Sequence, residues 1–275
     1  MSSIRDLLAV ALLLLATMLG ALWLPASWVE RTLIDQEGFL GVTAPLADDP
    51  DFQRTLTDSA VEQVLDDERV PGWIVERVTP LAEEQAARLT GTDLYGALWE
   101  TTMRELHGAL FTPGPSDLEV DLGPAVDRIL SGIEEHLPFG IEVPRPEDAT
   151  VTLATIPDVP LLTQASALAP WAPRLGPLAL LLALVALTVA AHRRTMLALA
   201  GFGAVVAGGA VWWLAAQIET VVPDSVDQAE FVGPVVQVFE ELFTAEVMPQ
   251  GVILLGVGAL VAAVGLVLIG LRRGS

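Results

Sequence analysis

Few residues in this chain could carry out acid–base or nucleophilic chemistry. The chain contains three histidines and no cysteine, so proton transfer would depend on His107, His136 or one of many carboxylates. His107 and His136 each have a structural explanation. His107 lies within an expected helix, and His136 lies at a helix end, where the dipole favours a cation. No Gly-x-Ser-x-Gly motif and no phosphate-binding glycine loop is present. We therefore expect no catalytic site and no cofactor.

A metal site is the second chemistry to consider. Asp117, Glu119 and Asp121 stand at alternate positions, as at the start of a calcium loop with oxygen ligands. The rest of that pattern is missing, since the expected glycine is replaced by Leu122 and the expected bidentate glutamate by Arg128. We expect weak binding of divalent cations to an acidic surface, and no specific metal site.

The arginines indicate how the chain is arranged around a membrane. All 14 basic residues are arginines, and three short clusters of them adjoin long apolar runs: Arg5, Arg193 with Arg194, and Arg272 with Arg273. Four apolar runs are long enough to span a bilayer, at residues 7–27, 174–192, 195–216 and 251–271. Basic residues in short loops mark the cytoplasmic side of a membrane protein. The sequence therefore predicts four transmembrane helices, with both termini and the 192–194 turn in the cytoplasm.

The acidic residues test this topology independently, because they were not used to choose the spans. Of the 35 Asp and Glu residues, 27 fall within residues 28–173, seven within 217–250, and only Asp6 lies elsewhere. Tryptophans favour the headgroup layer, and five of them lie at the outer ends of the spans: Trp23, Trp28, Trp171, Trp212 and Trp213. We expect an extracytoplasmic domain at 28–173 and an extracytoplasmic loop at 217–250 of a multi-pass plasma-membrane protein.

The first span has an alternative interpretation as a cleavable signal peptide. Its apolar stretch is longer than a typical signal-peptide core, and Leu24-Pro25-Ala26 lacks the small residue expected three positions before a cleavage site. An uncleaved membrane anchor is the better interpretation.

Composition limits what the outer domain binds and how it folds. Without cysteine it has no disulfide bonds, so its stability must come from a packed core, for which about 145 residues suffice. A net charge of −21 makes nucleic acid an improbable ligand and repels anionic lipid headgroups. The expected partners are the lipid bilayer and another protein or a second copy of the chain.

Hydrophobic periodicity predicts a mainly α-helical outer domain with a small antiparallel β element. Helices are expected from Asp49-Pro50 to about residue 70, from Thr79-Pro80 to Gly91, and from Asp93 to Leu110. The apolar face of the last helix consists of Leu94, Leu98, Leu106 and Leu110, with Trp99 and Tyr95 beside them. The alternation at 117–122 predicts a strand, and Gly123-Pro124 begins a short helix. Two further short strands are expected at 141–143 and 150–156.

The second outer loop contains an amphipathic helix. Between residues 224 and 246, apolar residues follow helical spacing, among them Val235, Phe239, Leu242 and Phe243. The opposite face is acidic and carries no basic residue, unlike helices that lie on anionic membranes. We expect the apolar face to bind protein, which is either the chain's own outer domain or another subunit.

Four short segments carry a resemblance to known proteins: the run Trp28 to Asp35, the run Thr43 to Pro50, the Val120 to Pro124 segment before a helix, and Arg193-Arg194 after the second span. In these segments the chain resembles a group of uncharacterised four-span integral membrane proteins from high-GC actinobacteria. It implies a membrane architecture and a bacterial host, and it supplies no catalytic residues.

Two classes of function remain open. The spans carry no ionisable residue at their centres, where a transport path usually has one. They contain pairs of small residues at positions 203/207, 204/208 and 258/262, which favour close helix packing within the bundle or against a second chain. We expect a non-catalytic membrane protein that acts through protein contacts of its acidic outer domain, with a component of a transporter or channel as the alternative.

Overall fold

The computed structural model confirms a mainly helical chain with one two-stranded antiparallel sheet in its described part. Residues 2–50, 52–54, 84, 88–89, 91–134, 149–156, 160–220 and 232–273 are described. The chain divides into two compact units. We call them the bundle unit (Met1–Asp35, Gln164–Pro223 and Gln237–Ser275) and the acidic unit (Gln36–Thr163 and Asp224–Val236).

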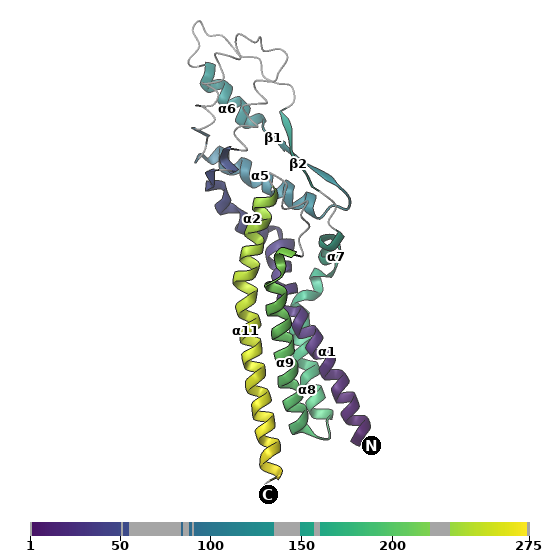
Figure 1. Cartoon of the computed structure of the whole chain (residues 1–275). Helices are drawn as coiled ribbons and strands as arrows, with labels where there is room; N and C mark the ends of the chain where they lie inside the picture. The colour runs from purple at the N-terminus through teal and green to yellow at the C-terminus, as the bar shows by residue number, and fades with distance from the viewer. Residues whose placement is uncertain are drawn as a thin grey trace. The chain divides into compact units, whose positions relative to one another are not determined.

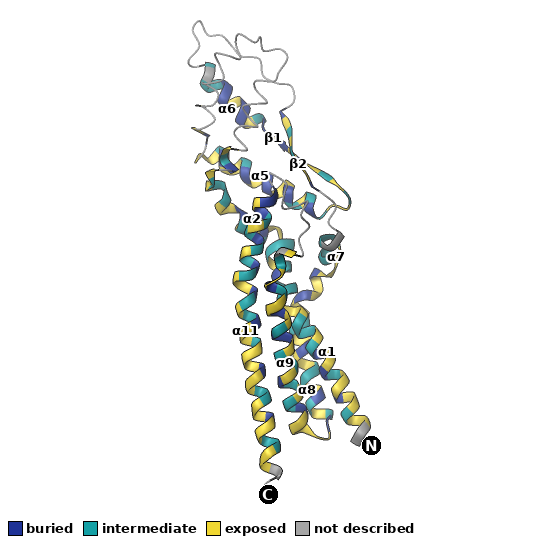
Figure 2. Cartoon of the chain, viewed as in Figure 1, coloured by how far each residue is buried: buried dark blue, intermediate teal, exposed yellow. Residues whose placement is uncertain are grey.

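The bundle unit is built on four helices, each long and apolar enough to span a membrane. They are α1 (Ser2–Val29), α8 (Ala172–Val189), α9 (Arg193–Ala215) and α11 (Val232–Arg273), the last from residue 237 onward (Figure 1). Helix α1 packs against both α8 and α9. Large apolar side chains cover the outward faces, including Leu14, Leu180 and Leu260, and are more than half exposed (Figure 2). Such faces are stable in contact with lipid and costly in contact with water.

The ends of the bundle are defined by contacts between residues far apart in sequence. Asp6, near the start of α1, bonds to the turn that joins α8 and α9, and Arg194 bonds to the carbonyl oxygen of Leu268 near the end of α11. We call this the Asp6 end, and both chain termini lie there (Figure 1). Trp28 lies at the opposite end of α1, which we call the Trp28 end. Both termini lie at one end because the chain runs along the bundle an even number of times.

Helix α11 is a single uninterrupted helix, whereas the sequence analysis treats residues 224–246 and 251–271 as separate elements. Pro249 lies inside α11 and has no N–H to donate to the preceding turn. Gly251 is in helical conformation and does not form a turn. The absence of a side chain there allows close packing against α9. The amphipathic segment therefore leads directly into the fourth apolar run.

Short elements flank the bundle helices. A π-helical turn, η1 (Glu30–Ile34), follows α1 and ends where Asp35 adopts an extended conformation. The segment before α8 contains α7 (Pro160–Leu168) and η4 (Ala169–Trp171), and η5 (Ile218–Thr220) follows α9. Elements η1 and η4 are in contact with each other at the Trp28 end.

The acidic unit contains α2 (Gln36–Thr43), η2 (Ala44–Asp48), α5 (Asp93–Leu110), β1 (Ser116–Asp121), α6 (Gly123–Glu134) and β2 (Thr150–Ile156). Gly91 has a φ of +75°, which ends the preceding helical segment, and the Thr92 hydroxyl caps α5 by accepting from the Tyr95 N–H. Strands β1 and β2 pair from Ser116 with Ile156 to Asp121 with Thr150. Leu118 and Val120 on β1 and Ile129 and Leu130 on α6 are almost fully buried.

These elements test the predicted secondary structure of the outer domain. The helix from Asp93 to Leu110, the strands near 117–122 and 150–156, and the helix at Gly123 are confirmed. On α5 the expected Leu106 and Leu110 are buried, and so are Tyr95 and Trp99, which were expected beside them, whereas Leu94 and Leu98 are only half-buried. The larger aromatic rings remove more apolar surface from water when they are buried, and they therefore set the orientation of the helix. The expected strand at 141–143, His136 and most of the two earlier helices lie outside the described residues.

Candidate interaction site

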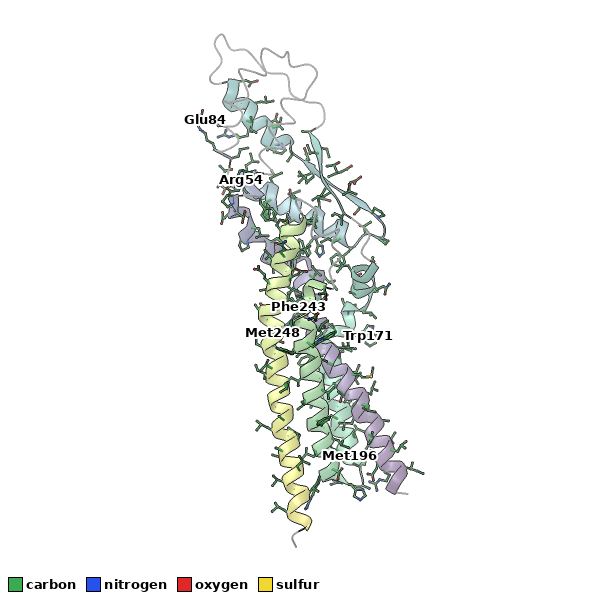
Figure 3. All side chains as sticks on the ribbon, viewed as in Figure 1. Arg54, Glu84, Trp171, Met196, Phe243 and Met248 are labelled. Atoms are coloured by element: carbon green, nitrogen blue, oxygen red, sulfur yellow. The ribbon has the colours of Figure 1, made fainter. Side chains whose placement is uncertain are left out.

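The amphipathic part of α11 contacts α1 at the Trp28 end of the bundle. The Trp28 ring meets the Phe243 ring edge-on, with centroids 4.9 Å apart, and Trp28 Nε1 donates a 3.0 Å hydrogen bond to Glu246 Oε2. The Thr244 hydroxyl donates to the carbonyl oxygen of Ala215 at the end of α9. Trp28 and Phe243 are 4% and 3% exposed, so these residues form a closed junction of three helices. We call Trp28, Phe243, Glu246, Thr244 and Ala215 the Trp28 junction. Phe243 is labelled in Figure 3.

The four residues expected to bind protein lie along one side of α11. Phe243 is buried in the Trp28 junction, Phe239 and Val235 are 7% and 2% exposed, and Leu242 is half-buried. Val235 belongs to the acidic unit and the other three to the bundle unit. The apolar stripe is therefore largely covered within a single chain, and for Phe243 the covering residue is Trp28.

The Asp6 end has a polar junction of its own. Asp6 Oδ1 accepts from the backbone N–H groups of Ala191 and His192 at 2.9 and 3.3 Å, and Asp6 Oδ2 lies 2.8 Å from His192 Nδ1. A carboxylate at this position satisfies backbone donors at the start of α9. Asp6 is the one acidic residue outside the two acid-rich segments, and this contact gives it a structural role that spacing alone does not reveal.

The topogenic arginines also make contacts at this end. Arg5 Nε donates to the carbonyl oxygen of Val189 at the end of α8, and Arg194 Nη1 donates to that of Leu268, at 3.0 and 2.9 Å. Cations placed against the last carbonyl groups of a helix are stabilised by its dipole. Arg193 begins α9 and is exposed, whereas the side chains of Arg272 and Arg273 lie outside the described part of the chain. Arg5 and Arg194 thus connect helices of the bundle.

Helices α9 and α11 pack backbone against backbone along a row of glycines. A methyl group added at Gly201 would lie 2.1 Å from the Ala262 nitrogen, and one added at Gly208 would lie 2.5 Å from the Leu255 nitrogen. Three glycines of α11 also approach the α9 backbone closely, since an added methyl group would lie 2.9 Å from it at Gly251, 2.6 Å at Gly258 and 2.5 Å at Gly265. Both sets recur every seven residues, the repeat of helices that cross at a shallow left-handed angle. We call these five residues the glycine seam.

The small-residue pairs noted in the sequence divide between two helix contacts. Ala204, Gly208, Gly258 and Ala262 lie in or against the glycine seam. Gly203 instead approaches α1, because a methyl group there would be 2.4 Å from Thr17 Oγ1. The structure thus assigns these positions to packing within one chain.

The acidic unit is organised around aromatic residues of α5. Trp99 Nε1 donates to the carbonyl oxygen of Thr43 at 3.0 Å, and the Trp99 ring meets Phe52 edge-on at 5.3 Å. The ring of His107 lies 5.1 Å from Phe39 and 4.9 Å from Phe111. This aromatic environment gives His107 a packing role.

Tyr95, the chain's single tyrosine, lies in the interior of the acidic unit. Its ring is 4% exposed, and its hydroxyl has no hydrogen-bond partner among the described residues. Burial, reinforced by the nearby charges of Asp48 and Asp49, raises the pKa of Tyr95 to about 12. Both effects penalise the tyrosinate anion and keep the phenol neutral.

The carboxylates considered as calcium ligands are engaged in local structure. Asp117 accepts from the Thr155 hydroxyl across the β-sheet at 2.8 Å, and Asp121 accepts from the Gly123 N–H at 2.8 Å, where α6 begins. Glu119 is exposed between them on β1. Within the described ranges, no group of three His, Asp or Glu side chains is placed to hold a metal ion together.

No protein-family model, curated protein or solved structure matches this chain. The functional argument therefore depends on the chain's own geometry and charge.

Proposed function

We propose that this chain is a non-catalytic, multi-pass protein of the plasma membrane whose acidic unit binds a protein partner on the extracytoplasmic side. In this role it acts as an accessory, assembly or structural subunit of a cell-envelope complex. The charge distribution carries the proposal, because residues 28–173 hold 27 carboxylates and only eight arginines. Dense surface charge of one sign steers a protein of the opposite sign into contact.

The same charge favours a different protein over a second copy of this chain as the partner. Two acidic units brought together would repel each other, which costs free energy wherever like charges face across an interface. Glu105 on α5 and Glu119 on β1 are exposed and have no ion-pair partner among the described residues. A basic surface would pair with carboxylates of this kind.

The bundle unit supports a role as a rigid membrane platform for this contact. The glycine seam, the Trp28 junction and the Asp6 contacts join its helices to each other. The expected topology places the Asp6 end in the cytoplasm, where positively charged loops are retained. The acid-rich segments 28–173 and 217–250 then lie outside.

Site-directed photo-cross-linking in living cells tests this function. A photoreactive residue at Glu105 or Glu119 should yield one discrete cross-link to a second protein, and the complex purified in mild detergent should dissociate as salt screens the charges. The matched control is Leu180, an apolar residue that is 63% exposed on the bundle and should yield only lipid adducts. Cross-links that are absent from the acidic unit, or an unaccompanied oligomer that responds to a small ligand, would contradict the proposal and favour a transport component.

A further inference from the structure

An apolar cleft of about 560 Å³ lies within the bundle unit. Its walls come mainly from α1, α8 and α9, with Leu254 contributed by α11. The cleft is open at its side, where Trp23 and Leu180 on its rim are 39% and 63% exposed. Its volume is within the range of sites that bind small organic ligands.

The lining of this cleft fits a hydrocarbon chain. Every lining side chain is apolar except that of Thr17, whose hydroxyl already donates a 2.9 Å hydrogen bond to the carbonyl oxygen of Leu13. Alanines and glycines predominate, so an occupant can approach close to the helix backbones. An empty apolar space forfeits dispersion contacts on all its walls, and in a bilayer the available filler is a lipid acyl chain.

Two arginines lie at the Trp28 end of the helices that form the cleft. Arg31 is in η1, two helical turns beyond Trp23, and its Nε donates to the carbonyl oxygen of Ser27. Arg174 lies in the first turn of α8, two residues before Gly176, another lining residue, and its guanidinium stacks over the Trp171 ring at 5.3 Å. Elements η1 and η4 touch, so both cations belong to one region of the bundle.

Neither arginine is neutralised by a carboxylate in the described part of the chain. Both are exposed, Arg31 makes its recorded hydrogen bond to a backbone carbonyl, and Arg174 makes its recorded contact with an aromatic ring. By contrast, Arg88 and Arg104 of the acidic unit each pair with a glutamate. Guanidinium groups bind phosphate oxygens in bidentate fashion, and basic pockets between transmembrane helices bind lipid headgroups.

We propose that the cleft between α1, α8 and α9 holds one acyl chain of a bilayer phospholipid, and that Arg31 and Arg174 bind its phosphate. The site is a local exception to the repulsion that the acidic unit exerts on anionic headgroups. It is independent of the proposed function, because it uses residues of the bundle unit alone. The lipid fills a space that the small lining residues leave open.

Native mass spectrometry of the full, delipidated chain in detergent tests this proposal. The probes are dioleoylphosphatidylglycerol, dioleoylphosphatidylcholine and dioleoylglycerol, which share acyl chains and differ in the presence of a phosphate. One phospholipid should be retained per chain, and dioleoylglycerol should bind at least about tenfold more weakly, as expected for loss of a charge-assisted hydrogen bond. Equal retention of all three lipids, or displacement of the phospholipids by inorganic phosphate alone, would overturn the proposal.

Two pairs of variants separate the headgroup site from the cleft. Arg31→Gln with Arg174→Gln should abolish the preference for phospholipid over dioleoylglycerol, whereas Arg128→Gln, an exposed arginine of α6, should preserve it. Ala200→Leu fills the cleft and should reduce retention of all three lipids, whereas Ala210→Leu on the exposed face of the same helix should not.

The arginine variants keep the test decisive if filling the cleft disturbs folding, because they alter exposed side chains only. An unchanged lipid preference in the double arginine variant would overturn the headgroup site. Unchanged retention in a folded Ala200→Leu protein would overturn the acyl-chain site.

Discussion

Replacing Gly208 by alanine should push α9 and α11 apart, and the neighbouring Gly209 provides the control. The added methyl carbon at Gly208 would lie 2.5 Å from the Leu255 nitrogen and 2.6 Å from the Gly251 carbonyl oxygen. Ordinary van der Waals contact begins at 3.4 Å, so the helices must separate by roughly 1 Å at this level. At Gly209 the same methyl group meets nothing within 4 Å.

The size of the effect follows from the loss of packing along the glycine seam. Overpacking of a tight contact costs about 1–3 kcal/mol, and a gap of this width removes a quarter to a half of each dispersion contact beside it. The gain in helix propensity from glycine to alanine is common to both variants and cancels in their difference. Gly208→Ala should therefore be about 1–3 kcal/mol less stable than Gly209→Ala.

Reversible unfolding of the full chain in mixed micelles, followed by helical circular dichroism, measures this difference. The expected result is a lower unfolding midpoint for Gly208→Ala and a midpoint near or above the parent's for Gly209→Ala. Equal midpoints for the two variants would show that α9 and α11 do not pack through the glycine seam, and the reasoning would fail.

Four further predictions concern Tyr95, Phe243 and Asp6. The folded pKa of Tyr95 is raised to about 12 from 10, so the unfolded chain loses its phenol proton first as the pH rises. The free energy of unfolding should therefore fall by on the order of 2 kcal/mol between these pH values. The tyrosinate absorbance of this single tyrosine measures the midpoint of its titration, and a midpoint near 10 would contradict the burial. Tyr95→Phe should remove this pH dependence and leave stability at neutral pH equal or higher, as measured by thermal unfolding, since the lost hydroxyl has no described partner. Phe243→Ser should lower the stability of the full chain by several kcal/mol, because it opens a cavity beside Trp28, and an unchanged melting temperature would refute this packing. Asp6→Asn should weaken the contacts that hold the α8–α9 turn, and unchanged hydrogen exchange at the His192 amide would contradict that role.

The apolar runs and helix signals predicted much of the fold because they depend on local sequence. Gly91 and Thr92 define the start of α5, and the alternation around Leu118 defines a strand that is buried on one face. Periodicity located the buried face of α5 but did not show that Leu94 and Leu98 lie at its edge and are only half-buried. Trp99 settles the orientation through its bond to Thr43, 56 residues away in sequence, and a pattern of local spacing carries no such information.

The contacts that join the bundle helices could be predicted only in part. The spacing of Gly208 and Gly258 indicated close packing without naming the partner helix, and the structure pairs α9 with α11. The role of Asp6 was not predicted, since its bond to His192 spans 186 residues. The apolar stripe identified Phe243 as a residue that must be covered. The sequence predicts a headgroup position for Trp28, the residue that covers it. Helical spacing identifies a face that must be covered, and tertiary contacts decide what covers it.

Cysteine accessibility in intact cells tests the membrane topology on which the account depends. The chain contains no cysteine, so single substitutions at Glu119, Thr220 and Ala191, all exposed, each introduce one reactive thiol. A membrane-impermeant maleimide should label the Glu119→Cys and Thr220→Cys variants in intact cells, and the Ala191→Cys variant only after the membrane is permeabilised. Labelling of Ala191→Cys in intact cells, with Glu119→Cys protected until permeabilisation, would place the acidic unit in the cytoplasm and contradict the account.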